Sequence, residues 1–151
     1  MIGDATQEQS ASLSQVVGRT VMANEEQAIR LDLDSTRRNF DGDANLIRDI
    51  GFIFIEDVPL LIQRLATLRL QLLADASRES AVLEEARRLA HSLKGLAGTF
   101  GAEPLGGMLA EIEQQPQRLV ALDGEQRLQE LERVAQQTIT ELTKCLDNHS
   151  L

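Results

Sequence analysis

The feature that most constrains the fold is the spacing of apolar residues, which recur every three or four positions over most of the chain after Leu31. The pattern is clearest near the C-terminus, where it comprises Leu128, Leu131, Ala135, Ile139, Leu142 and Leu146. This spacing keeps side chains on one face of an α-helix, whereas a half-buried strand alternates at every second residue. With four phenylalanines and no tryptophan or tyrosine, the core must consist of aliphatic residues, as is typical of helical bundles. We therefore predict an all-α fold, an antiparallel four-helix bundle with one or two short additional N-terminal helices.

Turn and capping residues divide this pattern into helices. Asp34-Ser35 is predicted to cap a short helix that ends at Phe40, followed by a turn at residues 41–43. Pro59 predicts a kink or a restart in the next helix, because proline removes a backbone donor and disfavours a helical residue before it. The apolar stripe of that helix is expected to include Leu46, Ile47, Ile50, Phe54, Ile55, Val58, Leu60, Leu61, Leu65, Leu68 and Leu72.

Three further helices are expected in the second half of the chain. Polar residues at 75–80 supply caps for a helix that runs until Gly101, which is predicted to take a left-handed conformation. Pro104 suits the first turn of a helix that ends near Pro116. Asp123-Gly124 opens the last helix.

The chain has the length of one domain. Residues 31–151 are predicted to form the bundle, and residues 1–30 a tail or linker. Part of this segment can be helical, since Leu13, Val16, Val17 and Val21 could line one face. Whether the chain is free-standing or the C-terminal module of a longer protein stays open at this point.

The charge and the cysteine content exclude several classes of protein. A net charge of −9 argues against binding to nucleic acid or to an anionic membrane, since both need clustered Lys and Arg. Cys145 cannot form an internal disulfide, because it is the single cysteine. Neither a secretory signal nor a membrane-spanning run is found, so the expected compartment is the cytoplasm. The two histidines are far apart, and neither metal-ligand spacings nor hydrolase or P-loop motifs are present.

His91 lies on the polar face of its predicted helix. At about 100° per residue, the side chains within roughly 60° of it are Arg87, Arg88, Lys94, Gly95 and Gly98. The opposite, apolar face consists of Leu83, Ala86, Leu89, Ala90, Leu93, Leu96, Ala97 and Phe100. A glycine within a helix costs about 1 kcal/mol relative to alanine. Two glycines beside an exposed imidazole therefore suggest that another molecule approaches the ring closely.

An exposed imidazole suits nucleophilic chemistry. A free imidazole has a pKa of about 6.5, so much of it is neutral near pH 7 and offers a ring nitrogen without a helper base. Lys94 lies one turn from His91 and could supply positive charge, to which Arg87 and Arg88 could add.

The stretch Ala-His-Ser-Leu-Lys-Gly-Leu-Ala-Gly-Thr-Phe-Gly-Ala, residues 90–102, resembles the active-site motif of histidine-containing phosphotransfer (HPt) domains, the relay modules of multistep two-component signalling. The resemblance covers about residues 31 to 146. It extends downstream to Leu105, Leu109, Ile112 and Glu113, and upstream to Phe54, Glu56, Asp57, Pro59 and Leu60.

The resemblance implies that His91 carries a phosphoryl group between receiver-domain aspartates, with a hybrid sensor histidine kinase and response regulators as partners. It further implies that Glu113 orients the imidazole and that Lys94 contacts the phosphoryl group. Arg87, Arg88, Gly95 and Gly98 are expected at the partner surface. The chain itself is expected to be monomeric, to bind no cofactor and to use no ATP, while Mg²⁺ belongs to the receiver.

Two rival interpretations remain. The histidine-phosphoacceptor domain of a sensor kinase usually has a proline soon after its histidine and an ATP-binding domain after it, and neither is present here. The rival from another class is a non-catalytic helical adaptor in which His91 is incidental. A domain that binds receivers without phosphorylation would require the loss of the histidine.

Overall fold

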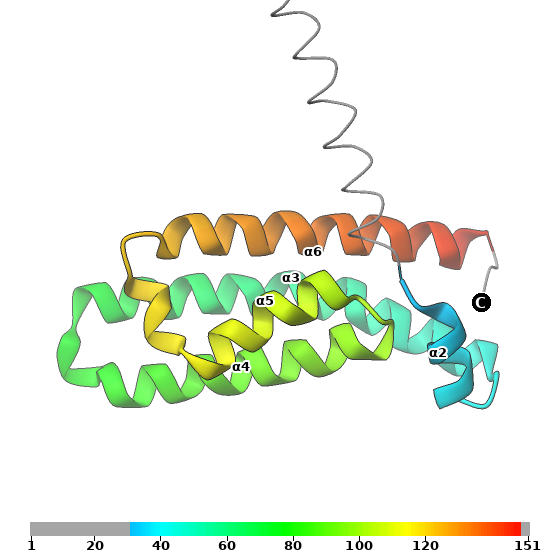
Figure 1. Cartoon of the computed structure of the whole chain (residues 1–151), viewed down its shortest axis with the longest axis horizontal. Helices are drawn as coiled ribbons and strands as arrows, with labels where there is room; N and C mark the ends of the chain where they lie inside the picture. The colour runs from blue at the N-terminus through cyan, green and yellow to red at the C-terminus, as the bar shows by residue number, and fades with distance from the viewer. Residues whose placement is uncertain (1–30, 149–151) are drawn as a thin grey trace, which may run out of the picture.

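The computed structural model describes residues 31–148, and this part of the chain contains helices and turns but no strand. The helices are α2 (Leu33–Asn39), α3 (Ala44–Ala74), α4 (Glu79–Thr99), α5 (Glu103–Gln114) and α6 (Gly124–Asp147), with short 3₁₀ helices η1 (Ala76–Arg78) and η2 (Pro116–Val120). Figure 1 shows the last four α-helices running back and forth along one axis, with α2 beside the start of α3. The predicted antiparallel four-helix bundle is confirmed, and α2 is the one short additional helix in the described range. Residues 1–30 and His149 lie outside the described residues.

The core lies between the apolar faces of the four long elements. Phe54 of α3 and Phe100 at the end of α4 are fully buried, and their rings meet edge to face with centroids 5.7 Å apart. This geometry stabilises an aromatic pair beyond the burial of its area. The other large side chains that are almost fully buried are Ile47, Val58, Leu65, Leu68, Leu93, Leu105, Leu109, Leu119, Leu131 and Leu142. Packing on this core fixes how α4 and α5 lie against each other.

Helix α3 departs from the prediction in two respects. It continues through Pro59 without a restart, because Pro59 is exposed and water can satisfy the carbonyl that a proline leaves unpaired. Leu46 and Leu60, predicted to lie in the buried stripe, are instead 43% and 63% exposed. Together with Ile53, which is 47% exposed, they are spaced by seven residues and so form one line along the helix. We call Leu46, Ile53 and Leu60 the α3 stripe.

The predicted turns and most helix starts are confirmed. Gly101 follows α4 with a φ of +64°, and Asp41 and Gly42 also have positive φ values. Helices α5 and α6 start where the sequence predicts. The first helix starts earlier than predicted, because the carboxylate of Asp32, not that of Asp34, accepts a hydrogen bond from a first-turn amide.

Helix α2 closes the C-terminal end of α4. The buried Thr36 donates its hydroxyl hydrogen to the carbonyl of Thr99 at 2.7 Å, and the backbone N–H of Asp32 donates to the carbonyl of Phe100 at 2.9 Å. These carbonyls belong to a helix end, where no partner within the helix is available. A Cβ on Gly101 would lie 2.3 Å from the Cβ of Asp32, so only glycine permits this approach. Helix α2 thus fixes the turn between α4 and α5.

Replacing Thr36 by valine should lower the free energy of unfolding by about 1 to 2 kcal/mol, because the shape is kept while the buried hydrogen bond to Thr99 is lost. Urea denaturation measures the change. The matched control is Thr140→Val, which removes a hydroxyl that bonds its own helix at an exposed position and should change stability by less than about 0.5 kcal/mol. Equal effects of the two substitutions would show that α2 does not cap α4.

Candidate functional site

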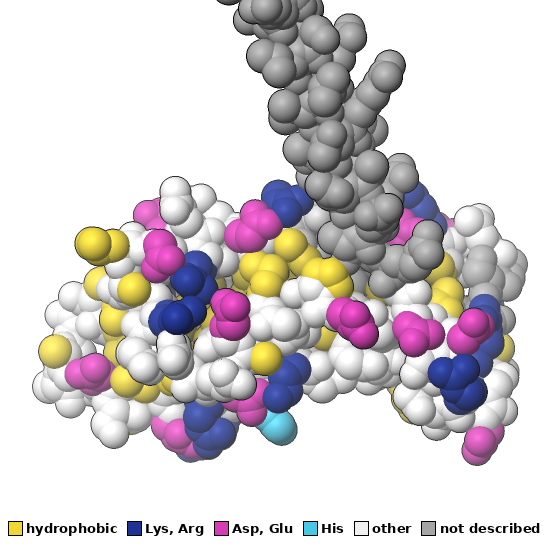
Figure 2. Space-filling model, viewed as in Figure 1, with side chains coloured by type: hydrophobic (Ala, Val, Ile, Leu, Met, Phe, Trp, Pro, Cys, Tyr) yellow, Lys and Arg dark blue, Asp and Glu magenta, His cyan; other side chains and the backbone are white. Residues whose placement is uncertain are grey.

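Helix α4 presents His91 to solvent. The residues that it buries are Val82, Ala86, Ala90, Leu93 and Ala97, all on the side opposite His91. The side chain of His91 is 67% exposed, and Figure 2 shows a histidine in cyan at the surface with basic and acidic side chains beside it. The ring is therefore open to a second molecule.

A single carboxylate holds both His91 and Lys94. Glu113 of α5 places Oε1 2.7 Å from Nδ1 of His91 and Oε2 2.6 Å from Nζ of Lys94. The neighbouring Leu109 and Ile112 are buried in the core, which seats α5 against α4 and leaves Glu113 only 17% exposed. Three of the predicted site residues thus come together across the α4–α5 contact.

The ionisation of Glu113 determines which ring nitrogen is free. The hydrogen bond from Lys94, and after it the one with His91, lowers the pKa of the Glu113 carboxyl below its usual range. The carboxylate is thus ionised near pH 7 and can only accept hydrogen bonds, so Nδ1 of His91 must carry the hydrogen. In the neutral ring this leaves the lone pair on Nε2. The contact therefore selects the tautomer whose nucleophilic nitrogen is Nε2.

An acid titration of stability will isolate the charge of Glu113. Because its pKa is lower in the folded chain, the carboxylate stabilises the fold above its ordinary pKa of 4.5 and loses that contribution as the pH falls through the folded value. We expect wild type to be more stable than Glu113→Gln near pH 7, with the difference shrinking as the pH falls below about 4.5. Urea denaturation at a series of pH values checks this. A difference that persists in acid would assign the effect to packing.

Arg87 and Arg88 are held by a residue that the sequence interpretation did not single out. Both nitrogens of an Arg87 guanidinium edge contact the carboxylate of Glu84, with Nε 3.0 Å from Oε2, and Nε of Arg88 lies 3.5 Å from Oε1 of the same group. The hydrogen bond from Arg87 lowers the pKa of Glu84, and the same contact raises the pKa of Arg87. The three- and four-residue spacing of these charges along a helix is the signal that could have identified Glu84.

Gly95 and Gly98 face open space. Both are exposed, and a Cβ built on either of them would have no atom within 4 Å. The packing of the bundle therefore does not require glycine at these positions. Their lack of side chains leaves the surface beside His91 flat.

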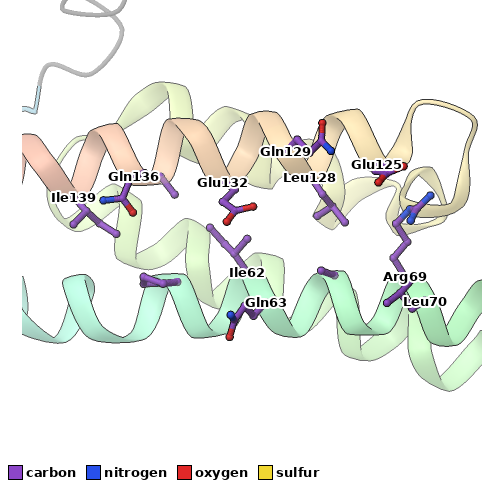
Figure 3. A pocket seen from close by; sticks show the side chains of 13 residues that line it. Ile62, Gln63, Arg69, Leu70, Glu125, Leu128, Gln129, Glu132, Gln136 and Ile139 are labelled. Atoms are coloured by element: carbon purple, nitrogen blue, oxygen red, sulfur yellow. The ribbon is translucent and has the colours of Figure 1, made fainter.

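A groove of about 330 Å³ lies elsewhere, between α3 and α6. Figure 3 shows Ile62 and Arg69 of α3 opposite Leu128 and Ile139 of α6 in this groove. None of the predicted site residues lines it. The groove is thus separate from the candidate site, which lies on an exposed face of α4.

Residues 31–148 contain no group of three or more His, Cys, Asp or Glu side chains placed to hold a metal ion. The same residues include no helix that is both long and apolar enough to cross a membrane.

Comparison with known families gives a match over most of the described residues. The family model described as Hpt domain matches residues 52–148, which include α4, α5 and every residue of the predicted site. Searches of curated proteins and of solved structures returned no significant match.

Proposed function

Because the chain belongs to the Hpt domain family, a family of phosphotransfer modules of two-component signalling and not of kinases, we propose that it is the histidine-bearing intermediate of a phosphorelay. His91 accepts a phosphoryl group from the aspartate of one receiver domain and passes it to the aspartate of another. The observation that carries this proposal is the exposed ring of His91, whose Nδ1 is held 2.7 Å from Glu113 while Nε2 is free.

The proposed step needs no proton acceptor. Nε2 of the neutral ring attacks the phosphorus of an aspartyl phosphate, the P–O bond to the aspartate breaks, and the aspartate leaves as a carboxylate. The ring gains positive charge while Nδ1 keeps its hydrogen, so the Glu113 carboxylate stabilises the phosphorylated form. The reverse step gives the phosphoryl group to the second receiver.

Lys94 supplies positive charge for the transferred group. It lies one helical turn from His91, and its side chain is 40% exposed while its ammonium group pairs with Glu113. Catalysis of phosphoryl transfer rests mainly on positioning and on neutralising the phosphoryl oxygens. Mg²⁺ and the acidic cluster that binds it belong to the receiver, and this chain binds no cofactor of its own.

The surface around His91 suits a protein partner. Gly95 and Gly98 give the receiver clearance beside the ring, and Arg87 and Arg88 add positive charge. The α3 stripe lies toward α4, because Arg64, one turn after Leu60, pairs with Glu85 of α4 at 2.9 Å. The stripe thus offers apolar contact area beside α4, on the side of that helix that carries Glu85. The partners are the receiver domains of response regulators and of a hybrid sensor histidine kinase. This chain binds them in the cytoplasm as a monomer.

The test is transfer from a receiver domain that carries labelled aspartyl phosphate, with Mg²⁺ present. Wild type should acquire label that is labile in acid and stable in base. Lys94→Gln should slow transfer about tenfold or more, because a group that stabilises the transition state is removed. The matched control is Lys144→Gln, an exposed lysine of α6 that also lies near a glutamate and should transfer at the wild-type rate. Absence of label on wild type would favour the adaptor interpretation.

A further inference from the structure

Glu84 lies on the same exposed face of α4 as His91, two helical turns before it. At about 1.5 Å of rise per residue, the two residues are about 10 Å apart along the helix axis. An interface of about 800 Å² per partner has a radius of about 16 Å. A receiver centred on His91 would therefore cover Glu84 as well.

The charges around the ring are nearly balanced. Three cations, Arg87, Arg88 and Lys94, face two carboxylates, Glu84 and Glu113, which leaves one net positive charge. Glu113 is occupied by His91 and Lys94, whereas Glu84 contacts only the arginines among these groups. Removing the charge of Glu84 would therefore double the net positive charge of these five groups and leave the contact to the ring intact.

We propose that Glu84 is a specificity-determining residue that neutralises Arg87 and Arg88 and thereby slows docking of receivers whose rim is acidic throughout. The proposal rests on the proposed function of His91. Receivers that present a lysine or arginine to Glu84 are favoured, because that cation pairs with the Glu84 carboxylate.

The effect belongs to the encounter and not to the chemical step. Charges at the rim of an interface act mainly on the association rate and on its salt dependence. At 0.1 M salt the Debye length is about 10 Å, comparable to the separation of Glu84 and His91 along the helix. A charge at this distance is felt at low ionic strength and is screened at high ionic strength.

The experiment compares wild type with Glu84→Gln in transfer from a phosphorylated receiver domain with an acidic rim. We expect the second-order rate constant, measured below saturation at low salt, to rise about threefold. The rate at saturating receiver should be unchanged, and the gain should vanish at 0.5 M salt. The matched control is Glu130→Gln on α6. Glu130 pairs with an arginine three residues later and is similarly exposed, so its loss should have no effect on transfer. Circular dichroism verifies that each variant is folded.

A variant that combines Arg87→Gln and Arg88→Gln distinguishes neutralisation of the arginines from a direct effect of the Glu84 charge on the receiver. If Glu84 works by neutralising the arginines, Glu84→Gln should no longer speed transfer in this background. Equal rates of wild type and Glu84→Gln, a gain that survives high salt, or a gain that survives loss of the arginines would each overturn the proposal. Failure of the proposed function gives a different result, because wild type would then acquire no label. That result would also overturn the proposal for Glu84.

Discussion

Replacing His91 by glutamine is expected to abolish phosphate uptake while the melting temperature stays within a few degrees of wild type. The side chain is 67% exposed, and its hydrogen bond to Glu113 lies at the surface of the bundle. Substitutions at such positions usually change stability by less than about 0.5 kcal/mol. Glutamine keeps a polar group near Glu113 but has no ring nitrogen to attack phosphorus. Activity and stability should therefore separate completely at this residue.

The measurement pairs labelling from a phosphorylated receiver with thermal unfolding followed by circular dichroism. Lys94, Glu113 and the glycines are unchanged in this variant, so the docking surface remains. Full labelling of His91→Gln, or label found on His149, would refute His91 as the acceptor. A loss of many degrees in melting temperature would show that the ring supports the fold, and the missing label could then not be assigned to chemistry.

The architecture was predictable because its determinants are local. Spacing of three to four residues identified the helices, and residues with special backbone preferences marked their ends. Gly101 is an example, since its φ of +64° is a conformation that glycine adopts without strain. Pro104 marked the start of α5 in the same way, because proline fits the first turn of a helix.

Helix α3 shows where local rules stop. The alternative of a restart at Pro59 weighed the lost hydrogen bond but could not weigh 31 residues of continuous helix packed on the core. Leu60 fits an apolar pattern yet is exposed, because burial depends on where the neighbouring helices lie. The spacing of apolar residues predicts which side of a helix is buried but not how wide the buried face is. An exposed apolar line such as the α3 stripe can therefore be identified only from the packed structure.

In the candidate site, too, some features follow from local rules and others depend on how the helices pack. Positions on one helix, such as His91 relative to Gly98, follow from helical geometry alone. The contact from Glu113 to His91 spans 22 residues of sequence, and only the family resemblance suggested it. The same carboxylate also pairs with Lys94. This second contact could not be predicted from the sequence, because it depends on how α4 and α5 pack against each other. The roles of these residues in transfer stay predictions until they are tested.

Gly98 provides the second large expected effect, because substitutions of different size there separate clearance from stability. A Cβ at this position would have no atom within 4 Å, so the fold has room for a side chain. Gly98→Ala should raise the free energy of unfolding by up to about 1 kcal/mol, since alanine favours the helix. Gly98→Leu should also stay folded.

The leucine variant is expected to lose transfer, because its side chain would project about 20° from His91 on the helical wheel, two turns further along the helix. A misplacement of about 1 Å between reacting groups can cost about 100-fold in rate, and a leucine that holds the receiver away from the ring should cost at least this much. Transfer from a phosphorylated receiver and the melting temperature are measured for both variants. Transfer at the wild-type rate by Gly98→Leu would refute the idea that glycine gives the receiver clearance. If this variant unfolds, Gly98 packs against another helix and the face of α4 around His91 is wrongly assigned.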